Sequence, residues 1–100
     1  MIKHIVLWKL KDAALGATKQ ENAAKMKQML EALNGVVPGG VKLEVGIDFS
    51  ATEASGDIVL YSEFPDRPAL DAYQAHPEHQ KCVAFVKEVV SERRVIDYEG

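Results

Sequence analysis

The sequence has little cysteine and no long hydrophobic run. Cys82 is the single cysteine among 100 residues, so an internal disulfide cannot form, and this usage suits a reducing compartment. No apolar segment approaches the roughly 20 residues that a membrane-spanning helix needs. The first residues, MIKHIVLWKLKD, carry charges inside their apolar run and lack a small-residue cleavage site, unlike a signal peptide. We therefore expect a cytoplasmic protein without membrane association.

The sequence also lacks an excess of basic charge. Its 12 Lys and Arg residues are scattered among 15 Asp and Glu residues, and the net charge is -3. A nucleic-acid surface usually needs a basic patch or stripe, so nucleic acid is not expected as a partner. There is no Gly-rich phosphate loop, no nucleophile elbow and no pair of carboxylates on a shared face. The length fits one small domain that covers residues 1–100.

What is present is a periodic alternation of strands and helices. Apolar residues alternate along residues 2–10 as in a strand, and the segment TKQE makes Thr18 an N-cap with Glu21 as its capping-box partner. Pro77 suits the first position of a later helix. In chain order, the expected elements are a strand at 2–10, a helix after Thr18 that ends at Asn34 and Gly35, strands at 41–49 and 58–64, a short helix after Asp66, a helix from Pro77 to about Val90, and a strand containing Val95, Ile96 and Tyr98.

This order is a strand-helix-strand unit used twice. It predicts an α+β fold of the ferredoxin-like type, βαββαβ, in which a four-stranded antiparallel sheet carries the helices on one face. The strands nevertheless have apolar residues for both faces, and the second strand alternates Val41, Leu43, Val45, Ile47 and Phe49. An apolar sheet face without helices needs a partner, most simply a second copy of the chain. We therefore expect a homodimer with a large apolar interface.

Two of the three histidines fall where a pocket between helices and sheet would lie. His79 shares a helical face with a run of apolar residues, and that face must turn toward the sheet. His4 lies in the first strand on the face of Trp8, and Tyr73 lies on the helix that precedes His79. The segment HPEH is therefore expected to aim His79 into an internal pocket beside Tyr73 and His4.

Each of these side chains also has a structural interpretation. A buried histidine with one hydrogen-bond partner is more often structural than catalytic, and a tyrosine on an apolar stripe is usually a core aromatic. A metal site made of His4, His76 and His79 is disfavoured, because Pro77 turns His76 away and catalytic metals usually need three held ligands. We expect neither a metal nor a cofactor.

Two segments of the sequence resemble a known family. The opening IKHIVLWKLKD and the late YQAHPEHQKCVAFVKEVVSERRVIDYE are similar to the stress-responsive α/β-barrel domain, called Dabb, and the similarity covers essentially all 100 residues. The resemblance implies a dimeric α/β barrel, in which two ferredoxin-like sheets pack face to face. It also implies a match to a plant polyketide cyclase of that family: His79 to its catalytic histidine, Tyr73 to its site tyrosine and His4 to its first-strand histidine.

Three functions are open at this point. The first is a binding protein whose pocket holds a small apolar or carbonyl-containing metabolite. The second is a polyketide-cyclase-like lyase, in which His79 is the general base, Tyr73 hydrogen-bonds the oxyanion and His4 orients or assists. The third is a cofactor-free monooxygenase of the dimeric barrel type, for which Trp8 is the aromatic residue that qualifies. The expected ligand-binding residues are Trp8, Met26, Leu30 and Val83.

Overall fold

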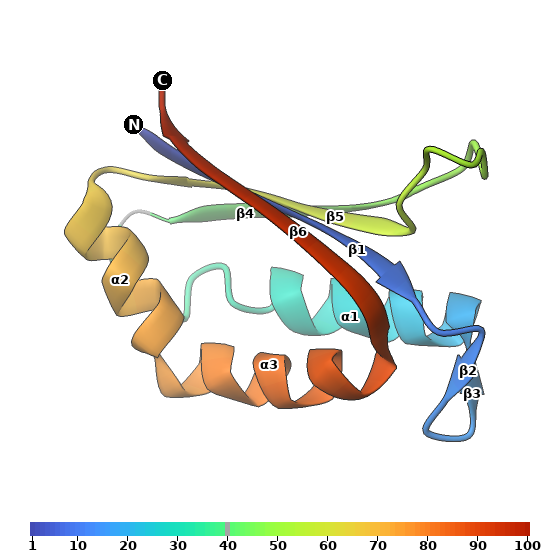
Figure 1. Ribbon diagram of the computed structural model, residues 1–100. Helices are drawn as coiled ribbons and strands as arrows, with labels where there is room; N and C mark the ends of the chain where they lie inside the picture. Colours follow the sequence, from blue (N-terminus) through green and yellow to red (C-terminus); the bar gives the residue numbers. More distant parts are fainter. Residues whose placement is uncertain (40) are drawn as a thin grey trace.

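The structure is a computed structural model that describes residues 1–39 and 41–100. A twisted sheet lies on one side and a layer of helices on the other, and the two chain termini lie close together at one end of the sheet (Figure 1). The elements are β1 (Ile2–Leu10), β2 (Ala13–Ala14), β3 (Ala17–Thr18), α1 (Lys19–Glu31), β4 (Lys42–Ile47), β5 (Ile58–Phe64), α2 (Arg67–Ala75), α3 (Pro77–Val89) and β6 (Val90–Glu99).

The main sheet has the strand order β4-β5-β1-β6, and every neighbouring pair is antiparallel. The first strand, β1, therefore lies between β5 and β6, which is the arrangement of ferredoxin-like folds. The helices cover one face of this sheet (Figure 1). The predicted ferredoxin-like α+β fold is confirmed, and the second helical segment is divided into α2 and α3 at His76.

The local signals that start the helices are present as predicted. The Thr18 hydroxyl accepts a hydrogen bond from the Glu21 backbone N–H at 3.2 Å, and the Glu21 carboxylate accepts one from the Thr18 N–H at 3.0 Å. Asp66 caps α2 through its side chain, and Pro77 occupies the first turn of α3. These caps fix the directions in which α2 and α3 begin, so they position the side chains near the junction of the two helices.

Two parts of the chain differ from the sequence-based prediction. β2 and β3 form a small hairpin that was not expected, and its turn holds Leu15 and Gly16 at positive φ values of 53° and 74°. β6 begins at Val90, directly after α3, and pairs with β1 along the length of both strands. Only the C-terminal part of β6 was recognised, because β6 is an edge strand and edge strands carry charges that interrupt the apolar pattern.

The strand predicted at 41–49 is only partly right. Leu43 and Val45 are buried against the helices, but β4 ends at Ile47. The side chain of Ile47 is 47% exposed, and Phe49, which lies beyond the strand, is 96% exposed. The alternating pattern continues past Ile47 although the backbone leaves the sheet there for the loop that leads to β5, so periodicity alone placed the end of the strand wrongly.

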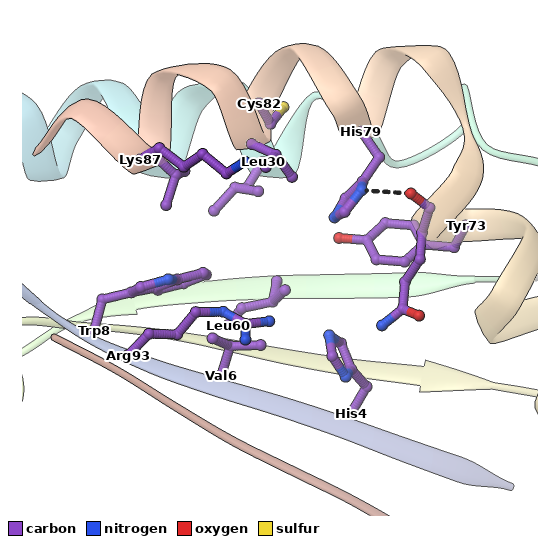
Figure 2. Close-up of a pocket in the computed structure, with 13 residues that line it drawn as sticks. His4, Val6, Trp8, Leu30, Leu60, Tyr73, His79, Cys82, Lys87 and Arg93 are labelled. Carbon is purple, nitrogen blue, oxygen red and sulfur yellow. Dashed lines mark hydrogen bonds between the residues drawn. The ribbon is translucent and has the colours of Figure 1, made fainter. Parts of the chain in front are cut away.

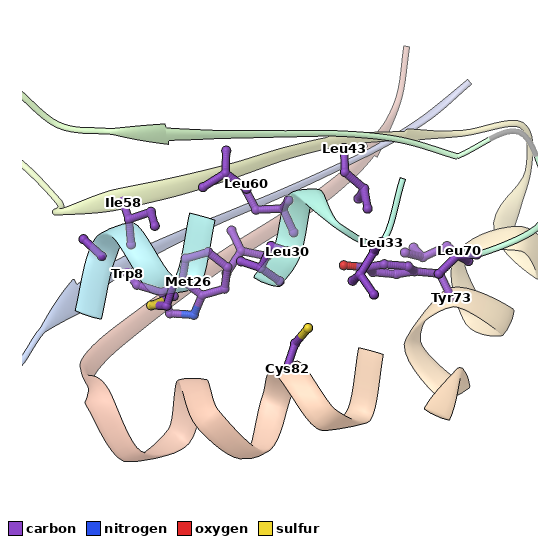
Figure 3. Packing of buried hydrophobic residues seen from close by; sticks show 14 of the residues in the cluster. Trp8, Met26, Leu30, Leu33, Leu43, Ile58, Leu60, Leu70, Tyr73 and Cys82 are labelled. Carbon is purple, nitrogen blue, oxygen red and sulfur yellow. The ribbon is translucent and has the colours of Figure 1, made fainter. Parts of the chain in front are cut away.

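The hydrophobic core fills the space between the sheet and the helices (Figure 3). Trp8 from β1, Met26 from α1, Leu60 from β5 and Cys82 from α3 are all buried in it. Helices and strands both contribute because α1 and α3 turn their apolar stripes toward the sheet.

On the opposite face of the sheet, residues 1–39 and 41–100 place no helix (Figure 1). Ile5 and Leu7 of β1 point to this outer face, since they alternate with residues buried in the core. Ile96 of β6 pairs with Ile5 in the sheet and is 58% exposed. The uncovered apolar sheet face that the sequence predicted is therefore present.

Candidate functional site

A cavity of about 250 Å³ lies between β1 and α3, with α2 beside it (Figure 2). Aliphatic side chains line its middle. The polar side chains near the α2–α3 junction are His4, Tyr73, Gln74 and His79. The polar side chains toward the other end of α3 are Trp8, Lys87 and Arg93. The cavity thus has one end lined by imidazole, phenol and amide groups and another that carries cations.

Tyr73 brings the two histidines of the cavity into one cluster. Its ring centroid lies 4.4 Å from that of His79 and 6.4 Å from that of His4. The Tyr73 side chain is fully buried, and its hydroxyl has no hydrogen-bond partner among the described residues. Burial raises the pKa of Tyr73 far above its ordinary value, so the hydroxyl keeps its proton and can only be a neutral donor or acceptor.

His79 is held by the kink between α2 and α3. The Nδ1–H of His79 donates a hydrogen bond to the Gln74 carbonyl at 3.1 Å, while the neighbouring His76 caps α3 by accepting from the Glu78 backbone N–H. The bond to Gln74 leaves Nε2 of His79 with its lone pair, on the end of the ring that points into the cavity (Figure 2).

The charge state of His79 follows from its surroundings. Burial lowers the pKa of His79, and nearby His4, Arg93 and His76 lower it further when they are positive, although the bond to the Gln74 carbonyl acts in the opposite direction. His79 is therefore neutral at pH 7. A neutral imidazole with a free Nε2 in a cavity has the form that a general base requires.

His4 is positioned by a carboxylate that the sequence reasoning missed. His4 is 3% exposed, and its Nδ1 is hydrogen-bonded to the carboxylate of Asp97, its cross-strand neighbour on β6. A carboxylate acceptor fixes the proton on Nδ1 and leaves Nε2 for the cavity. Asp97 lies two residues after Val95, so strand alternation could have placed both side chains on one sheet face. The pairing of β6 with β1 was needed to connect Asp97 with His4.

Lys87 and Arg93 also line the cavity, although neither was predicted from the sequence. Lys87 lies four residues after Val83, so helical spacing could have placed it on the cavity face. Arg93 lies opposite Trp8 on the neighbouring strand, and this relation depends on the register of β6. The indole N–H of Trp8 is buried without a hydrogen-bond partner among the described residues.

The structure brings together most of the predicted site residues. His4, Tyr73, His79, Trp8, Leu30 and Val83 all line the cavity. Met26 does not line it: the side chain is fully buried in the core beside the cavity (Figure 3), because this part of α1 faces the sheet directly. The described cavity therefore does not include Met26, which packs in the core, whereas the other three predicted ligand-binding residues line it.

Within residues 1–39 and 41–100, no group of three or more His, Cys, Asp and Glu side chains is arranged to hold a metal ion. None of the helices there is both long enough and apolar enough to cross a membrane.

The fold and the cavity define a ferredoxin-like α+β domain, and solved structures of this class are similar to it. A dimeric protein of unknown function with a ferredoxin-like fold from Bacteroides fragilis is 33% identical, with a TM-score of 0.84 over 99% of this chain and 95% of that one. A Dabb family protein from Mesorhizobium loti is 26% identical, with a TM-score of 0.68 over 99% and 95% of the two chains. An antibiotic biosynthesis monooxygenase shares the fold at 18% identity, with a TM-score of 0.73 over 100% and 98%.

The chain belongs to the Dabb family, the Stress responsive A/B Barrel Domain, whose model matches residues 2–100. A curated CTP synthase from Corynebacterium kroppenstedtii is 47% identical over 36 residues, which are 36% of this chain. The match spans 6% of that synthase, so it is a local similarity and carries no statement about the activity of this chain.

Proposed function

We propose that this chain binds a small carbonyl-containing molecule with an apolar body in the cavity between its helices and its sheet. The observation that carries this proposal is the Tyr73 hydroxyl, which is fully buried beside the cavity without a hydrogen-bond partner in the described part of the chain. A buried donor without a partner is typically destabilising by about 1–3 kcal/mol. A ligand carbonyl that accepts this hydrogen bond would remove the penalty, so the ligand-free protein is prepared for an acceptor.

The dimensions of the cavity support a small ligand. A cavity of about 150 Å³ is known to hold benzene, so about 250 Å³ suits a single ring or a short chain with one substituent. Leu30, Val83 and other aliphatic side chains line the middle and would contact the apolar body. Binding would therefore combine apolar burial with one oriented polar contact.

A second candidate function, a lyase of the polyketide-cyclase type, is supported by His79. In this reaction Nε2 of His79 would take the proton from a carbon next to the ligand carbonyl. The electron pair of that C–H bond would move toward the carbonyl, and the Tyr73 hydroxyl would hydrogen-bond the resulting oxyanion. His4, held by Asp97, would orient the substrate or assist. General-base help of this kind is worth roughly 10²- to 10⁴-fold in rate.

The sequence around the kink supports the same candidate. The His-Pro-X-His segment with the tyrosine before it resembles that of olivetolic acid cyclase, a plant member of the Dabb family that closes a linear polyketide. The resemblance covers residue types in the cluster of His4, Tyr73 and His79. A cofactor-free monooxygenase is the weaker alternative, since the monooxygenase similarity extends to the fold alone, and of the Asn or Trp that such a site needs, the described cavity residues supply Trp8.

The homodimer expected from the sequence is part of this proposal. The Bacteroides fragilis protein, at 33% identity over nearly the whole chain, is described as dimeric. The outer face of the sheet, with Leu7 and Ile96 exposed at its surface, is the surface that a second copy would cover. A cytoplasmic location is proposed as well, and the lone Cys82 supports it.

A thermal-shift screen of small ketones, oxo acids and thioesters tests the binding proposal. A ligand that fills the cavity should raise the Tm of the wild-type chain and raise that of Tyr73→Phe by less. If a ligand stabilises both proteins equally, the hydroxyl is not its partner. Hits are then incubated with the wild-type chain and with His79→Ala: product formed by the wild type alone would support the lyase, whereas binding without product would favour the non-catalytic dimer.

A further inference from the structure

The cavity carries a charge imbalance that carbonyl binding does not use. Lys87 of α3 and Arg93 of β6 line it, and the described residues that line it include no acidic side chain. The chain as a whole has the opposite balance, with 15 acidic against 12 basic residues. Both side chains are exposed to solvent, and two cations that line one cavity of an acidic protein give that cavity a local preference for negative charge.

Neither cation has an acidic partner in the described part of the chain. The contrast with the next residue is informative, because Arg94 points to the outer face of the sheet and pairs with Glu92 at 3.6 Å. Arg93 instead extends along the sheet with its guanidinium toward the cavity (Figure 2). The guanidinium has five N–H donors in a planar fork that matches a carboxylate or a phosphate.

Trp8 adds a donor of a different kind to the same region. Its side chain is buried, its indole N–H has no acceptor among the described residues, and it is the cross-strand neighbour of Arg93. Lys87 lies across the cavity on α3 (Figure 2). An anionic group between α3 and the sheet would therefore meet two cations from different elements, with the Trp8 side chain beside them.

We infer that the cavity selects ligands that carry a negatively charged head group, a carboxylate or a phosphate monoester, at the Trp8, Lys87 and Arg93 end. The ligand class is then a small oxo acid or oxo phosphate with an apolar body, oriented with its carbonyl toward Tyr73 and its anion toward Arg93. This inference rests on the proposed function, since it adds the second end of the same ligand.

The test is calorimetric binding of three matched aryl ketones: 3-benzoylpropionate, its methyl ester and phenacyl phosphate. The wild-type chain should bind 3-benzoylpropionate about tenfold tighter than the neutral ester, and the difference should shrink as salt is added. Arg93→Met and Lys87→Met should each weaken the two anionic probes by about three- to tenfold and change binding of the ester by less than about twofold. The probe that loses more affinity identifies the preferred anion.

Two control variants lose the same positive charge at positions outside the cavity. Arg94→Met removes the neighbouring cation on the outer face, and Lys81→Met removes a cation of α3 that pairs with Glu78 at 3.1 Å. Neither should affect any probe. Equal affinity of the acid and the ester for the wild type, or equal losses for both in Arg93→Met, would overturn the inference while leaving the carbonyl site intact. Failure of the neutral ester to bind, with acid binding insensitive to Tyr73→Phe, would instead refute the proposed function.

Discussion

The substitution Tyr73→Phe should make the ligand-free protein more stable and its ligand binding weaker. The Tyr73 ring is packed within the core against Phe64, with ring centroids 5.1 Å apart, and phenylalanine keeps that ring. What the change removes is a hydroxyl that is buried without a partner among the described residues. The destabilisation by such a group is typically about 1–3 kcal/mol, and the variant should recover much of it.

The size of the effect makes it easy to measure. For a domain of this length, a change of 1 kcal/mol in the free energy of unfolding shifts Tm by about 4–8 °C. Chemical denaturation and calorimetry at one fixed protomer concentration would therefore resolve the gain, and the fixed concentration matters because a dimer's Tm depends on it. In saturating ligand the stability difference between Tyr73→Phe and the wild type should shrink or change sign, since the wild-type hydroxyl then forms a hydrogen bond worth about 0.5–1.5 kcal/mol.

The control is Tyr61→Phe, in which the lost hydroxyl already donates to the Glu63 carboxylate at 3.0 Å. This variant should show no gain in stability. If Tyr73→Phe were less stable than the wild type by about 1 kcal/mol or more, the Tyr73 hydroxyl would already be satisfied in the ligand-free protein. The cavity would then offer no unpartnered hydroxyl to a ligand, which would refute the proposed hydrogen bond.

Three further predictions concern His79, Ile96 and Cys82. Burial lowers the folded-state pKa of His79, so below about pH 6.5 the unfolded chain binds more protons than the folded one. The free energy of unfolding should therefore fall as the pH drops from 6.5 toward that lowered pKa. In urea titrations at several pH values, His79→Gln should show a flatter dependence on pH. Light scattering should show that Ile96→Glu converts a dimer to monomers, whereas Ala84→Glu, on the exposed surface of α3, should not. A stable wild-type monomer at micromolar concentration would contradict the proposed dimer interface on the outer face of the sheet. Burial, with a smaller contribution from Glu78, raises the pKa of the Cys82 thiol, so iodoacetamide should label it at least about tenfold more slowly in the folded than in the unfolded chain, and equal rates would show that the thiol is exposed.

Some of this protein follows from local sequence alone. The alternation in residues 2–10, the capping box at Thr18 and the proline at 77 are signals between residues near one another in the chain, and they predicted β1, α1 and α3. The order of strands and helices then limited the fold to the ferredoxin-like arrangement. The same local signals placed His79 on the sheet-facing side of its helix, because offsets of three and four residues define a helical face.

Tertiary structure decided the features that depend on distant pairings. Asp97 meets His4, and Arg93 lies beside Trp8, only because β6 pairs with β1 in one register, and shifting that register by one residue would turn both side chains to the outer face. Met26 and Leu30 occupy one helical stripe, yet only Leu30 reaches the cavity, since the position of α3 determines where packed core ends and open space begins. The sequence by itself therefore determined which elements form and which faces they bury, whereas the register between β1 and β6 and the placement of α3 determined the contents of the cavity, because these depend on contacts between residues far apart in the chain.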